Sequence, residues 1–154
     1  MVKKAEVLDA NDTSNLDKAA KVLRKGGLVA FPTETVYGLG ADAFNPQAVA
    51  KIFEVKKRPT FDPLIVHVAT AEQANLLWKE TSPAAQALMK SFWPGALTIV
   101  LPKSERVPDI VTADLPTVAV RMPSNKTAMR LINALGHPVA APSANHFCYK
   151  NPTT

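Results

Sequence analysis

Short apolar runs alternate along this chain with segments that carry helix start and stop signals. Runs of this kind, bounded by turn residues, are typical of buried strands. Because strands and helices alternate, the pattern predicts an α/β protein whose sheet is covered by helices. It leaves the strand order open. The strand-like runs are residues 28–31, 64–68, 97–101, 118–122 and 139–141.

Four helical segments separate these runs. A side chain that can accept a hydrogen bond from the first turn stands at each start, and proline follows two of these residues. Glycines stop the first and last helices, and the other two should end near Lys56 and Phe92. The stretch 32–42 reads as turns. The expected starts are Ser14, Asn45, Ser82 and Ser124, and the glycine stops are Gly26-Gly27 and Gly136.

Composition narrows the class of protein. The single cysteine, Cys148, excludes an internal disulfide and suits a reducing compartment, so we expect a cytoplasmic protein. No apolar run reaches the length of a membrane span, residues 1–16 are too polar for a secretory signal, and no repeat or linker divides the chain. We therefore expect one domain over residues 1–154 and no membrane contact. The net charge of +5 favours anionic ligands but is also common in ordinary soluble proteins.

Residues 32–40, PTETVYGLG, directly follow a strand-like run. Ligand sites of open α/β sheets form beyond the carboxyl ends of strands, and hydroxyls and glycines allow a ligand to approach the backbone. The segment is a candidate ligand loop. A polar turn with two glycines explains the same residues.

Three cations, Lys56, Lys57 and Arg58, stand together at an expected helix end, where Pro59 follows. Charge-assisted contacts to a phosphate would neutralise them. Cations are also mildly favourable at any helix C-terminus, so a purely structural role stays open.

His67 and Arg121 lie within apolar strand-like runs. A histidine in this setting is either a hydrogen-bonded structural residue or a ligand contact. The guanidinium of Arg121 needs a carboxylate or phosphate partner, which a ligand or an internal Asp or Glu could supply. The run 141–145, APSAN, offers a hydroxyl and an amide suited to phosphate or ribose, or forms a plain turn. The chain has no Walker phosphate loop, no G-x-G-x-x-G fingerprint and no H-E-x-x-H zinc helix.

Taken together and in order, six segments resemble the threonylcarbamoyl-AMP synthase (YrdC) family from about residue 16 onward. They are FPTETVYGLGA at 31–41, K-x-R at Lys56 and Arg58, PLIVH at 63–67, WPGALT at 93–98, TVAVRMP at 117–123 and APSAN at 141–145. The resemblance implies a twisted, mostly mixed open sheet with helices on its faces. It also implies a nucleotidyltransferase that makes threonylcarbamoyl-AMP and pyrophosphate from L-threonine, bicarbonate or CO2, and ATP, with Mg2+ carried by the nucleotide. Transfer proteins would then pass the threonylcarbamoyl group to tRNA.

The resemblance also assigns roles to residues. Lys56 and Arg58 would be catalytic, and no residue is expected to bind a metal. Threonine would contact Thr35, His67, Arg121 and the Ala141 backbone. ATP would contact Lys56, Arg58, Asp62, Thr117, Ser143, Asn145 and Asn151.

This chain departs from the family pattern at three places. It has Lys57 where the family usually has glycine, Asp62 where it has asparagine, and Asn151 where it has serine. Members normally continue beyond residue 154, so we expect the family's C-terminal strands to be absent and a sheet edge to lie open. Two other functions stay open. One is a non-catalytic domain that binds tRNA or double-stranded RNA, and the other is a carbamoyl-handling module like that of hydrogenase-maturation proteins.

Overall fold

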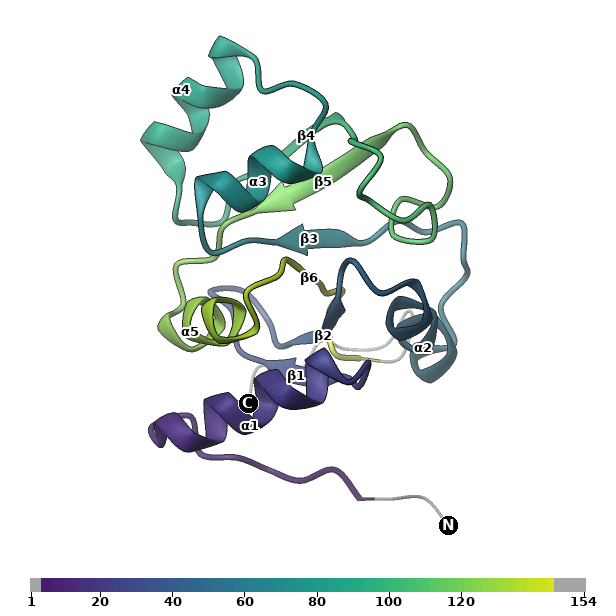
Figure 1. Cartoon of the computed structure of the whole chain (residues 1–154), viewed down its shortest axis with the longest axis vertical. Coiled ribbons are helices and arrows are strands. Elements are labelled where there is room, and N and C mark those ends of the chain that lie inside the picture. Colours follow the sequence, from purple (N-terminus) through teal and green to yellow (C-terminus); the bar gives the residue numbers. More distant parts are fainter. Residues whose placement is uncertain (1–3, 146–154) are drawn as a thin grey trace.

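The computed structural model describes residues 4–145 (Figure 1). These residues form both helices and strands, as the apolar runs and caps predict. The helices are α1 (Thr13–Arg24), α2 (Pro46–Lys56), α3 (Ala71–Leu77), α4 (Pro83–Phe92) and α5 (Lys126–Leu135). The strands are β1 (Val29–Phe31), β2 (Gly38–Asp42), β3 (Ile65–His67), β4 (Thr98–Pro102), β5 (Thr117–Arg121) and β6 (Val139–Ala140).

The strands form one sheet in the order β1-β2-β6-β3-β5-β4 (Figure 1). Among the strands of residues 4–145, only β3 and β5 pair in parallel, with His67 beside Arg121, and the other neighbours pair antiparallel. The predicted mixed open sheet with helices on its faces is therefore confirmed.

Helices cover the two faces of this sheet unequally. Val66, Val118 and Val120 point into a hydrophobic core shared with α2 and α3. The opposite face packs on α1 and α5, but only through residues near β1 and β6, such as Phe31 and Val139. Figure 1 shows α1 and α5 together at one end of the molecule.

Within residues 4–145, no helix packs on the far half of that second face. Side chains alternate along strands and paired residues share a face, so Ile65, Ala119 and Val100 lie on it together. Ile65 and Ala119 are only partly buried, and Val100 is 58% exposed. Thr117 and Arg121 lie on the same side of β5 as Ala119. These five residues are called the open sheet face below.

Two predicted helix starts are wrong by one or two residues. Asp12, not Ser14, caps α1, because its carboxylate accepts a 2.9 Å hydrogen bond from the Ser14 N–H. Asn125, not Ser124, caps α5, because its side chain accepts from two N–H groups of the first turn. Each true cap is a neighbouring residue with the same hydrogen-bonding capacity. The other predicted starts, at Asn45 and Ser82, are confirmed.

The sequence reading missed β2 and α3. The interpretation of residues 32–42 as turns is wrong for its second half, which forms β2 although two of its five residues are glycines. Gly40 is needed there because a Cβ atom would lie 2.7 Å from both Phe31 and Val139. Helix α3 spans only seven residues, which is too short for a clear periodic pattern. None of the helices within residues 4–145 is long and apolar enough to span a bilayer.

Candidate ligand-binding site beside the open sheet face

The loop of residues 32–37 joins two groups of predicted site residues. At its far end Tyr37 O accepts a 2.7 Å hydrogen bond from Ala144 N, and Leu39 N donates to Pro142 O at 2.9 Å. Near its start, the Glu34 carboxylate accepts hydrogen bonds from the turn that precedes α5. The loop therefore fixes the APSAN segment and the end of β5 relative to each other.

Lys56 is buried at the end of α2, with 2% of its surface exposed. Its ammonium donates to Ser143 O at 2.5 Å, to Asn145 O, and to Asn145 Oδ1 at 3.3 Å. An ammonium has three protons, so all of them have acceptors within the protein. Lys56 therefore holds the APSAN segment against α2, and direct contact with a ligand would require it to exchange one of these acceptors.

Arg58 and Asp62, four residues apart in the segment between α2 and β3, form an ion pair with Nη2 2.9 Å from Oδ2. The same guanidinium donates to Pro63 O at 3.1 Å, two residues before β3 begins. Lys57, between the two predicted catalytic cations, has a left-handed backbone with φ +52°. Glycine adopts this conformation without strain, which accounts for the glycine that the family usually has here. Asp62 supplies a negative charge beside Arg58 that an asparagine would not.

His67 and Arg121 contact each other at the carboxyl ends of β3 and β5. Arg121 can only donate, so its Nη2 donates to His67 Nε2 at 2.9 Å and the imidazole carries its proton on Nδ1. Arg121 Nε and His67 Nδ1 are buried without a hydrogen-bond partner in residues 4–145. Buried polar atoms are rarely left unpaired, so this point of the sheet is a candidate site for a polar ligand.

Glu34 is the internal carboxylate that the sequence analysis left open as a partner for Arg121. Its Oε1 lies 3.8 Å from Arg121 Nε. Burial works to raise the pKa of Glu34, but hydrogen bonds from the backbone of Ser124 and Asn125 and the charge of Arg121 outweigh it. The pKa of Glu34 is therefore below its ordinary value, and the group is a carboxylate at neutral pH.

Burial, reinforced by the positive charge of Arg121, lowers the pKa of His67 from 6.5 to about 3. The unfolded chain takes up a proton on this residue as the pH falls through 6.5, whereas the folded chain does not until about pH 3. The free energy of unfolding should therefore decrease as the pH is lowered from about 6.5 toward 3, by up to about 1.4 kcal/mol per pH unit.

The prediction is that His67→Gln removes this slope. Between pH 6 and pH 5 the original protein should lose about 1 kcal/mol more unfolding free energy than the variant. Urea unfolding at a series of pH values measures both. Parallel stability curves for the two proteins would contradict a buried neutral His67.

Three of the remaining predicted residues lie in different segments of the described chain. Thr117 begins β5 on the open sheet face, two positions before Ala119. Ala141 is buried, and its N–H donates to Ile65 O at 3.0 Å. Thr35 is exposed in the 32–37 loop, with its hydroxyl 3.2 Å from that of Thr33. Asn151 lies outside the described residues.

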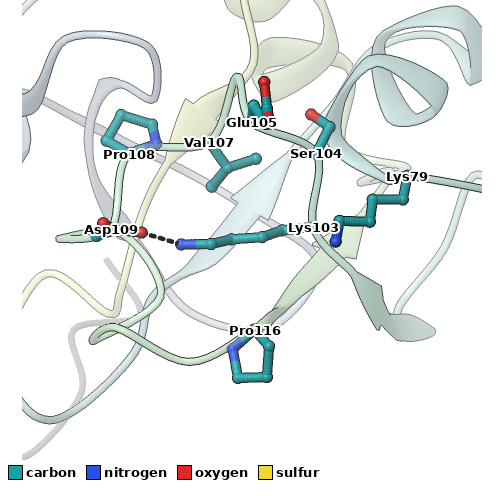
Figure 2. A pocket seen from close by; sticks show the side chains of 8 residues that line it. All are labelled: Lys79, Lys103, Ser104, Glu105, Val107, Pro108, Asp109 and Pro116. Atoms are coloured by element: carbon teal, nitrogen blue, oxygen red, sulfur yellow. Dashed lines mark hydrogen bonds and ion pairs between the residues drawn. The ribbon is translucent and has the colours of Figure 1, made fainter.

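A hollow of about 450 Å³ lies elsewhere, beside the end of β4 (Figure 2). Lys79, Lys103 and Asp109 line it, and Lys103 is already paired with Asp109 at 2.6 Å. None of its lining residues is a predicted site residue. In the described part of the chain, no group of three or more His, Cys, Asp or Glu side chains could hold a metal ion.

The position of Glu34 beside Arg121 was not predicted. The residue lies inside the candidate loop, but its negative charge gave no reason to expect it near an anion site. The signal that could have found it is the need of Arg121 for a carboxylate partner, since Glu34 is the acidic residue of the 32–40 motif.

Comparison with known proteins gives consistent matches. A family model described as Sua5_yciO_yrdC, Telomere recombination, matches residues 21–154. The chain is 55% identical over 136 residues to the threonylcarbamoyl-AMP synthase of Pyrococcus abyssi, which covers 88% of this chain and 40% of that protein. It is 51% identical over 147 residues to the threonylcarbamoyl-AMP synthase of Bacillus subtilis, covering 95% of this chain and 42% of that protein.

A solved structure is also similar. The crystal structure of P. abyssi Sua5 complexed with L-threonine matches with a TM-score of 0.91 and 52% identity, over 93% of this chain and 42% of that one. The chain thus spans about two fifths of the length of these relatives.

Proposed function

Because the chain belongs to the Sua5/YciO/YrdC family, we propose that it makes threonylcarbamoyl-AMP and pyrophosphate from L-threonine, bicarbonate or CO2, and ATP. Relatives that are 51% and 55% identical carry the name of this activity. The observation that carries the proposal is the junction made by the 32–37 loop. On one side Tyr37 O of this loop accepts a hydrogen bond from Ala144 N, which lies between the two residues that Lys56 contacts, and on the other side Glu34 of the loop forms an ion pair with Arg121.

Threonine is proposed to bind at the carboxyl ends of β3 and β5. Arg121 would bind its carboxylate, which matches a guanidinium in geometry and charge. His67, Thr35 and the Ala141 backbone would complete the contacts. The His67 Nδ1 atom, which is buried without a hydrogen-bond partner in residues 4–145, supports this assignment, and the P. abyssi structure complexed with L-threonine supports threonine as the ligand.

ATP is proposed to bind across the open sheet face, with its phosphates near Arg58 in the segment that follows α2. Arg58 would contact the phosphates, while Lys56 would act through its charge and through the segment that it holds. Mg2+ would arrive on the nucleotide as part of the substrate. The remaining nucleotide contacts are proposed to be Asp62, Thr117, Ser143, Asn145 and Asn151.

The protein contributes to this reaction mainly by positioning the substrates and by neutralising the negative charge of the phosphates. The amine of threonine adds to CO2 and loses a proton, giving a carbamate. A carbamate oxygen then attacks the α-phosphorus of ATP, and pyrophosphate leaves as the new P–O bond forms. We propose that residues 1–154 act as one domain in the cytoplasm and that transfer proteins pass the product's threonylcarbamoyl group to tRNA.

The direct test is to incubate the protein with ATP, bicarbonate and labelled threonine. The expected products are labelled threonylcarbamoyl-AMP and pyrophosphate in equal amounts, and neither should form without threonine. Absence of both products, together with RNA binding that weakens steeply with salt, would instead favour the RNA-binding function.

A further inference from the structure

The two carboxylate oxygens of Glu34 have different partners. Oε2 accepts three hydrogen bonds, from Ser124 N at 2.9 Å, Ser124 Oγ at 3.2 Å and Asn125 N at 3.2 Å. Oε1 faces Arg121 Nε at 3.8 Å. The three donors fix the carboxylate, so the position of Oε1 beside the guanidinium is set by the fold.

This arrangement places a fixed negative charge beside a fixed positive one. The other partner of Arg121, His67, is neutral, so in residues 4–145 Glu34 is the acidic residue that forms an ion pair with Arg121. Both side chains still reach the surface, at 19% exposure for Glu34 and 12% for Arg121. A small ligand at this point would therefore meet both charges.

We propose that Glu34 is a specificity-determining residue that makes this end of the site select a zwitterionic amino acid over a carboxylate without an amino group. In an α-amino acid the nitrogen and the carboxylate carbon are about 2.5 Å apart. A zwitterion can therefore place its carboxylate on Arg121 while its ammonium faces Glu34 Oε1. A plain carboxylate gains the first contact but is repelled by Glu34, and such repulsion between like charges suppresses wrong partners.

The inference rests on the proposed function, because it concerns the same threonine site. It adds a residue to which no substrate contact was assigned, and it gives that residue a role that binding experiments can isolate. Arg121 alone would favour any small carboxylate, whereas the pair of charges requires both ends of the amino acid.

The experiment compares the affinities of L-threonine and 3-hydroxybutanoate, which lacks the amino group, for the original protein and for Glu34→Gln. The glutamine oxygen can still accept from Ser124 and Asn125, so the change removes the charge and keeps these hydrogen bonds. The original protein should prefer threonine by at least about tenfold, and Glu34→Gln should reduce this preference about tenfold, chiefly by binding 3-hydroxybutanoate more tightly.

Ser124→Ala is the matched control, because it removes one hydrogen bond to Glu34 and keeps the charge; its preference should equal that of the original protein. If a folded Glu34→Gln protein kept the same preference for threonine over 3-hydroxybutanoate, this inference would be wrong, but the proposed function would stand. Equal affinity of the original protein for the two ligands would overturn it even if the variant did not fold. Failure of the original protein to bind threonine would overturn the proposed function as well.

Discussion

Replacing Lys56 with methionine is expected to lower the free energy of unfolding by about 2–3 kcal/mol, because partly buried oxygens of Ser143 and Asn145 lose a charged donor. Methionine keeps most of the apolar stem, so the effect reports the ammonium. Adenylate formation should fall by at least on the order of a hundredfold, since the APSAN segment loses its anchor and the site loses a charge. Urea unfolding and pyrophosphate release measure the two effects.

Lys57→Gly is the control for the loss of one positive charge. Lys57 is exposed and has a left-handed backbone that glycine adopts without strain, so stability should stay within about 1 kcal/mol of the original. Pyrophosphate release should also be nearly unchanged. If Lys56→Met proved as stable and as active as Lys57→Gly, the proposed anchoring by Lys56 would be wrong.

Much of the fold follows from local sequence signals. Asn45 and Ser82 cap helices as predicted because each carries an acceptor side chain directly before a proline. The errors at Ser14 and Ser124 arose where an equally good acceptor stood one or two residues away. Strand β2 was not predicted because its glycines suggested a turn. Gly40 is required there by the close approach of Phe31, which is a tertiary contact that local sequence does not reveal.

The candidate site was predictable as a set of segments but not as a network. Lys56 and Arg58 were identified by their charge, yet the acceptors of Lys56 lie almost ninety residues away. Such contacts depend on the order of strands, which the apolar pattern leaves open. Glu34 was missed for the same reason, since its partner Arg121 becomes a neighbour only when the sheet forms. The roles of all the predicted site residues, Asn151 included, stay predictions.

Arg58→Ala is expected to reduce the rate of adenylate formation by on the order of a hundredfold or more. In the proposed reaction Arg58 neutralises charge that develops on the phosphates as pyrophosphate leaves, and loss of one preorganised donor of this kind costs ~2.7–4 kcal/mol. The loss should appear in the rate with saturating ATP and threonine, measured as pyrophosphate release. Threonine affinity should change little, because Arg121 and His67 are at the other end of β3 from the Pro63 carbonyl that Arg58 contacts.

Asp62→Asn separates this role of Arg58 from its ion pair. The variant keeps Arg58 but removes the carboxylate with which it forms the 2.9 Å ion pair, and it introduces the amide that the family usually has. With no carboxylate to offset Arg58, ATP binding should be equal or tighter, and the rate should stay within about threefold of the original, since partly exposed ion pairs contribute little to stability. If Asp62→Asn lost as much activity as Arg58→Ala, the ion pair itself would be the essential feature, and direct neutralisation of phosphate by Arg58 would be refuted.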